Sequence, residues 1–177
     1  MKANKFILYF ILKAAGVYAV WYMIYDLWLK KSGEFDSWIV DSIVYSAYSI
    51  LTFFNYDVNI DHHKLWLVDA KGSVIVGSGC DGLELYVLFI GFVLIFAGSW
   101  KNKVWFIPAG VLVLYYLNVL RIIALALNGV TSVSLLRFNH KYTFTIILYL
   151  VTFLGWMIWV KYFSDTPKIK NEGTEIE

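Results

Sequence analysis

The chain of 177 residues has little cysteine and little net charge, and each scarcity excludes a class of protein. A single cysteine excludes an internal disulfide framework and a cysteine-based zinc site, so Cys80 is either packed or reactive. A net charge of +2 is too small, and the lysines are too scattered, to indicate a nucleic-acid-binding surface. Hydrophobic residues make up 60% of the chain, whereas soluble domains are nearer about 45–50% apolar, so composition indicates a membrane protein.

Long apolar runs are abundant. Crossing a bilayer takes roughly 20 apolar residues, and residues 6–29, 83–100, 104–127 and 142–163 qualify. Residues 38–54 form a shorter run that carries Asp41 and several hydroxyl side chains, which favours an interfacial or partly inserted helix. The sequence therefore predicts an all-α polytopic membrane protein of about four transmembrane helices plus an interfacial helix. Residues 1–177 are expected to form a single domain.

The distribution of lysines predicts an orientation. Lysines precede the first run, crowd a short loop at 101–103 and follow the last run, and the positive-inside rule places these groups in the cytoplasm. Residues 30–82 and 128–141 then face outward. In the first of these segments, two β-branched runs on either side of residues 69–72 predict a small β-hairpin on the extracytoplasmic side. A polar tail follows over residues 166–177.

Cys80 lies in GSGCDGLELYVLF, where a turn-rich segment becomes an apolar run. A thiol at a helix N-terminus is close to the positive end of the dipole, which favours the nucleophilic thiolate. Asp81 and Glu84 oppose this because they disfavour a second negative charge, although Asp81 can also cap the helix. Two interpretations of Cys80 stay open, a reactive nucleophile and a packing residue.

Arg121 is a costly residue inside a span, at roughly 2.5–3.5 kcal/mol at the bilayer centre. Asn118 shares its helix face, which predicts an inward-facing polar site, with snorkelling to the headgroups as the alternative. His140 precedes the last run. Antiparallel spans are expected to bring Cys80, Arg121 and His140 to one depth. Acyl transfer through a thiol requires such a nucleophile, acid–base group and oxyanion-stabilising cation.

The order of GCDG (79–82), Asn118-x-x-Arg121 and His140 resembles the exosortase/archaeosortase family of membrane cysteine transpeptidases, most closely its compact exosortase F-type members. The resemblance covers about residues 78–162. It implies that Cys80, Arg121 and His140 are catalytic, with Asn118 and Asp81 as supporting residues and no cofactor. Many members have serine or threonine where this chain has Asp81.

The resemblance also implies a setting and a substrate. The protein would be a multi-pass protein of the bacterial inner membrane, in contact with lipid, with its active site facing the extracytoplasmic side. Its partners would be exported proteins with a C-terminal sorting signal, which consists of a short motif, a transmembrane helix and a basic end. The sequence does not predict an oligomeric state.

Other functions stay open on the residues alone. One is a membrane acyltransferase that uses Cys80, and another is a non-catalytic scaffold in which Arg121 pairs with a partner's carboxylate. A metal site at Asp57, Asp61, His62 and His63 is not expected, because adjacent histidines in a strand point to opposite faces.

Overall fold

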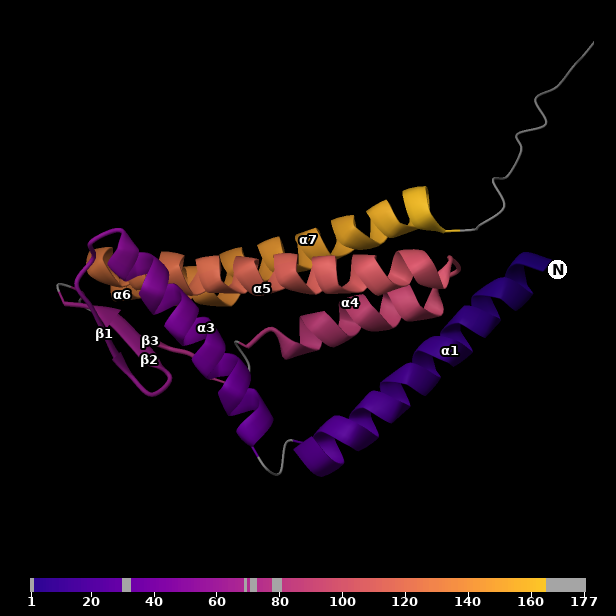
Figure 1. Ribbon diagram of the computed structural model, residues 1–177, viewed down its shortest axis with the longest axis horizontal. Coiled ribbons are helices and arrows are strands. Elements are labelled where there is room, and N and C mark those ends of the chain that lie inside the picture. The colour runs from indigo at the N-terminus through magenta and orange to yellow at the C-terminus, as the bar shows by residue number, and fades with distance from the viewer. Residues whose placement is uncertain (1, 30–32, 69, 71–72, 78–80, 165–177) are drawn as a thin grey trace, which may run out of the picture.

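The computed structural model of the chain describes residues 2–29, 33–68, 70, 73–77 and 81–164, most of them helical (Figure 1). Helix α4 (Leu83–Ile95), helix α5 (Trp100–Thr131) and helix α7 (Phe144–Ile158) lie side by side. Helix α1 (Lys2–Ile24), extended by the π-helical η1 (Tyr25–Leu29), packs against α4. We call the end of the molecule that holds the small β-sheet and the last turns of α5 the sheet end.

Glycines let the three central helices approach closely. The Phe89 side chain of α4 points between α5 and α7, where a Cβ at Gly110 would fall on its ring and a Cβ at Gly155 would come within 2.9 Å of it. Phe89 is also stacked on Phe106 of α5, with ring centroids 5.8 Å apart. Small residues serve this purpose in membrane helix packing because apolar burial alone drives little association in lipid.

Helix α4 ends at Ile95, five residues before the predicted run ends at Trp100. Its last carbonyls, of Leu94 and Phe96, accept hydrogen bonds from Lys103 Nζ at 2.8 and 2.9 Å. The hydropathy of the sequence carries no sign of this end, because the turn at 96–99 is itself largely apolar. The prediction that Lys101–Lys103 form the loop was therefore wrong, since α5 already begins at Trp100.

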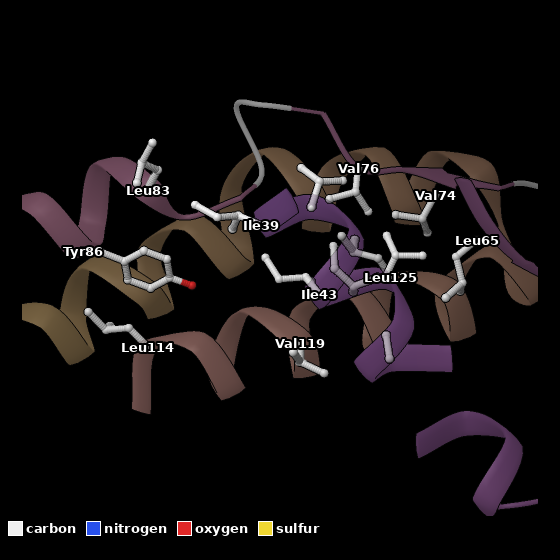
Figure 2. Close-up of a cluster of buried hydrophobic side chains, with 14 of the residues drawn as sticks. Ile39, Ile43, Leu65, Val74, Val76, Leu83, Tyr86, Leu114, Val119 and Leu125 are labelled. Carbon is white, nitrogen blue, oxygen red and sulfur yellow. The ribbon is translucent and has the colours of Figure 1, made fainter. Parts of the chain in front are cut away.

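Helix α3 (Glu34–Phe53) covers most of the segment 38–54, whose interfacial position stays a prediction, and it runs obliquely across α5 near the sheet end (Figure 1). Its buried apolar residues recur at helical spacing, which gives one continuous face; they are Ile39, Val40, Ile43, Val44, Ala47 and Leu51. Figure 2 shows Ile39 and Ile43 in the same buried cluster as Val76 and Leu125. The Tyr115 hydroxyl lies 2.8 Å from the hydroxyls of both Ser42 and Ser46, which ties α3 to α5.

The predicted hairpin is present, and it belongs to a three-stranded antiparallel sheet of order β1-β2-β3. Strands β2 (Lys64–Leu67) and β3 (Val74–Ile75) pair with Leu65 opposite Val74. The sequence did not predict β1 (Val58–Asp61), which pairs with β2 through a tight turn. The fold class of the chain is therefore mainly helical with a sheet, rather than all-α with a hairpin.

The placement of the two adjacent histidines was also wrong, because they occupy the β1–β2 turn rather than a strand. His62 has φ +48°, and His63 Nε2 lies 3.1 Å from Ser37 Oγ and 3.2 Å from an Asp41 carboxylate oxygen. Within the described part of the chain, no group of three or more potential ligands is placed to hold a metal ion.

Two helical stretches of the described residues are long and apolar enough to cross a membrane, Trp100–Thr131 and Val133–Phe163. The second is built from α6 (Val133–Phe138), η2 (Asn139–Thr143), α7 and η3 (Trp159–Phe163). These stretches contain the third and fourth predicted spans. The total of four spans stays a prediction.

Candidate active site

The turn into α4 is shaped by a glycine and an aspartate. Gly82 has φ +78°, a conformation that L side chains rarely adopt, and it directly precedes the helix. Asp81 is buried, and its Oδ1 accepts a hydrogen bond from the Leu83 N–H at 3.0 Å. This bond satisfies one of the N–H groups that a helix start leaves open. The residue that follows Cys80 is thus buried and hydrogen-bonded at the start of α4.

Helix α5 supports the same turn through Asn118. A Cβ on Gly82 would lie 3.1 Å from Asn118 Nδ2 and 3.4 Å from the Tyr86 hydroxyl, so glycine lets the turn come this close. Asn118 is only 1% exposed. The sequence predicted that Asn118 and Arg121 share one face of their helix. In the structure the Asn118 amide also packs against the turn that follows Cys80.

Arg121 and His140, which are 19 residues apart in the sequence, meet in the structure. Arg121 Nη2 donates a hydrogen bond to the His140 carbonyl oxygen at 3.3 Å. His140 lies in η2, a π-helical turn of the kind that often occurs at functional sites. Arg121 is buried, and its Nε has no hydrogen-bond partner among the described residues. Snorkelling to the surface is therefore wrong for this arginine, because its side chain turns inward.

A cavity of about 210 Å³ joins the start of α4 to Arg121. Asp81 and Gly82 lie on one side of it and Arg121 on another, and α7 adds Thr145 and Tyr149. Thr145 and Tyr149 were not predicted as site residues from the sequence. Their spacing of four places both on one face of a helix that begins just after His140, and this was the available signal.

The cavity contains a carboxyl group with an altered acidity. Burial raises the pKa of Asp81 from 3.8 to about 6, and the nearby charges of Asp36 and Glu84 add to this, although backbone hydrogen bonds oppose it. Asp36 comes from α3 and accepts a hydrogen bond from the Tyr25 hydroxyl at 2.9 Å. The sequence predicted an effect of Asp81 and Glu84 on Cys80, but not the effect of Glu84 and Asp36 on Asp81. The approach of Asp36 depends on how α3 packs.

Cys80 itself lies outside the described residues, with Ser78 and Gly79. The structure brings Arg121 and His140 into contact and gathers Arg121 and Asp81 around one cavity. Asp81 adjoins Cys80 in the chain. The geometry of the thiol stays a prediction.

A family comparison decides what kind of protein carries this arrangement. The family model for transmembrane exosortase (Exosortase_EpsH) matches residues 8–159. The chain belongs to the transmembrane exosortase family. It is accordingly a membrane protein, and the match covers every helix from α3 to α7 and all five residues of the predicted site. Neither the curated proteins nor the solved structures give a match to this exosortase.

Proposed function

We propose that this exosortase is a membrane cysteine transpeptidase or protease that cleaves C-terminal sorting signals from exported proteins through a thioester on Cys80. The contact between Arg121 and His140, at a cavity that Asp81 also lines, carries the proposal. A buried arginine whose Nε–H has no hydrogen-bond partner among the described residues is suited to stabilise negative charge that develops beside it. Membership of the exosortase family supports the assignment of the nucleophile.

The proposed reaction has two halves. Cys80 Sγ attacks the carbonyl of the scissile peptide after His140 takes the thiol proton, and Arg121 donates to the tetrahedral oxyanion. The C–N bond breaks, and the leaving amine departs with the proton from His140, which releases the C-terminal helix. An amine or water then attacks the thioester, the C–S bond breaks, and the Cys80 thiol is restored.

Asp81 has an indirect part in this proposal. Its charge disfavours the Cys80 thiolate, so the positive end of α4 and the charge of Arg121 must outweigh it for reaction near neutral pH. A pKa near 6 keeps part of the Asp81 population protonated under mildly acidic conditions. We therefore assign Asp81 as a positioning residue, which holds the turn and tunes the thiol.

The proposed location is the bacterial inner membrane, with the sheet end facing the extracytoplasmic side. This orientation follows from the lysines near both termini under the positive-inside rule. The single sizeable segment before α4 supports assignment to the compact F-type branch of the family. Labelling of Cys80 from the cytoplasmic side alone would contradict the orientation and the mechanism together.

The test compares envelope proteins by mass spectrometry in cells that carry the natural chain or Cys80→Ala. We expect a set of exported proteins to lose a hydrophobic C-terminal helix only with the natural chain. Arg121→Gln and His140→Ala should resemble Cys80→Ala. Identical proteomes with folded, abundant variant protein would contradict sorting and favour an acyltransferase or a scaffold.

A further inference from the structure

Four hollows follow α4 from one end to the other and connect through shared lining residues. The active-site cavity shares Glu84, Leu85 and Tyr149 with a hollow of about 400 Å³. That hollow shares Tyr18, Trp21, Val87 and Leu88 with a third of about 350 Å³. The third reaches Ile95 and shares Phe92 and Trp156 with a fourth. Together they form a groove with α4 as its floor and with walls from α1 and α7.

The chemistry of the groove changes along its length. At the start of α4 it is lined by Asp81, Glu84, Arg121 and Thr145, which are charged or polar. The third hollow is lined by aliphatic and aromatic side chains. Gly91 also lines it, and a Cβ at this position would contact Val17 on the opposite wall. Tyrosines and Trp21 lie between these regions. A groove that is polar at one end and apolar along the rest suits a peptide whose first part lies in water and whose following part lies in lipid.

We infer that this groove binds the transmembrane helix of the substrate, so that the extended segment preceding that helix enters the cavity of Asp81 and Arg121. The inference deepens the proposed function and rests on it. Helix α4 has 13 residues, a length of about 20 Å, so a helix lying along it would deliver its outer end to the turn after Cys80. The groove thus selects the kind of substrate and sets where it is cut.

A phospholipid fits the groove less well than a helix does. A lipid lying with its acyl chains along the apolar part would place its phosphate near the carboxylates of Asp26 and Glu84. Like charges repel, and among the described residues Arg121 is the one cation that lines either the active-site cavity or the second hollow. A peptide segment brings no obligatory charge there, and its backbone N–H groups can donate to the carboxylates.

Photo-crosslinking tests the inference directly. A benzoylphenylalanine is placed at Leu88, which lines the groove, or at Leu112 on α5, which lines none of the four hollows. Both side chains are about half exposed, at 44% and 55%. The chain carries Cys80→Ala so that uncleaved substrate accumulates, and the crosslinked peptides are sequenced from cell membranes. We expect Leu88 to capture C-terminal apolar helices of exported proteins several-fold more than Leu112.

A blocking variant gives a second readout. Leu88→Trp in a chain with natural Cys80 should raise the uncut fraction of those proteins several-fold, whereas Leu112→Trp should not. The inference would be overturned if position 88 crosslinked mainly to lipid or to a second copy of the chain. It would also be overturned if position 88 captured no more C-terminal helices than position 112.

The two proposals fail in distinguishable ways. Cys80-dependent loss of C-terminal helices, without their capture at Leu88, would refute the groove and leave the proposed function standing. Capture of helices at Leu88 without any Cys80-dependent cleavage would refute the proposed function and keep the groove as a helix-binding site. Absence of both would refute both.

Discussion

Arg121 is the residue on which the proposed chemistry depends most. Its guanidinium group is buried, binds the His140 carbonyl and lines the cavity beside Asp81. Such a group supplies preorganised charge and N–H groups where an oxyanion forms, and it can also fix the π-helical turn that carries the histidine. The two contributions are separable by substitution.

We expect Arg121→Gln to lower the rate of sorting-signal cleavage by about 10²–10³-fold, because a preorganised donor and its charge are lost. Arg121→Lys should retain more activity, since it keeps the charge without the planar fork. Cleavage rates of a substrate found by the proteomic comparison give the measurement. Unchanged thermal unfolding of both variants would show that the loss is chemical, and full activity of Arg121→Gln would refute its role.

Asp81 should make stability depend on pH. Its pKa is about 6 in the folded protein and near 3.8 when unfolded, so the folded state binds more protons between these values. The contribution of Asp81 to stability is therefore present at low pH and lost as the pH rises through about 6. Asp81→Asn keeps an oxygen for the Leu83 N–H and carries no charge. We expect its melting temperature to exceed that of the natural chain above pH 6, and the two to converge below about pH 4.

The same substitution should change the reactivity of the thiol. With the Asp81 charge removed, Cys80 should be alkylated faster by iodoacetamide at pH 7.5, because the thiolate is less disfavoured. The rate ratio of variant to natural chain should fall toward one at pH 5, where natural Asp81 is largely protonated. A ratio that does not vary with pH would show that Asp81 acts on Cys80 only through the shape of the turn.

At the scale of elements, α4 is the helix on which the position of the site depends most. It contacts α1, α5 and α7, and it begins at the turn that follows Cys80. Its position depends on Phe89, which needs the absence of a side chain at Gly110 and Gly155. A substitution that shifts α4 would therefore also move the turn at Gly82.

Gly110→Ala should destabilise the helix packing by about 1–3 kcal/mol, because its methyl group meets the Phe89 ring. Phe89→Leu in the same chain should recover part of that loss, so the two changes should couple in a double-mutant cycle of unfolding in detergent. Gly16→Ala is the matched control, since nothing lies within 4 Å of its Cβ position. Additive losses from Gly110→Ala and Phe89→Leu would contradict the contact.

The other end of α4 gives a further test. Lys103→Met should cost about 1–3 kcal/mol, because the carbonyls of Leu94 and Phe96 lose a charged donor. Lys101→Met is the control, as Lys101 is exposed and lies two residues away on the same helix. Equal unfolding free energies for the two variants would show that Lys103 does not hold the end of α4.

At the scale of the whole molecule, the sequence predicted the family and the proximity of two polar residues, whereas the catalytic roles of the site residues stay predictions. Arg121 and His140 were expected at one depth because antiparallel runs carry them, and their contact confirms this. The exosortase resemblance is confirmed over residues 8–159. These inferences depended on polar residues inside apolar runs or directly before them, which stand out without any knowledge of packing.

Features set by tertiary contacts were missed. The end of α4 depends on Lys103, and β1 depends on a turn at His62 with positive φ, which the local sequence does not signal. The raised pKa of Asp81 depends partly on Asp36, which approaches only because α3 folds across α5. Hydropathy and residue spacing describe each segment by itself, whereas these features depend on contacts between segments.

The most direct test of the central claim is the chemical identity of the adduct on Cys80. Cells that carry the natural chain are quenched in acid, and the proteolytic peptide that contains Cys80 is analysed by mass spectrometry, with Cys80→Ala as control. We predict a hydroxylamine-labile thioester whose acyl part is the C-terminal peptide of a mature exported protein. A fatty-acyl adduct, or none while C-terminal helices are still removed, would contradict a peptidyl thioester as the intermediate.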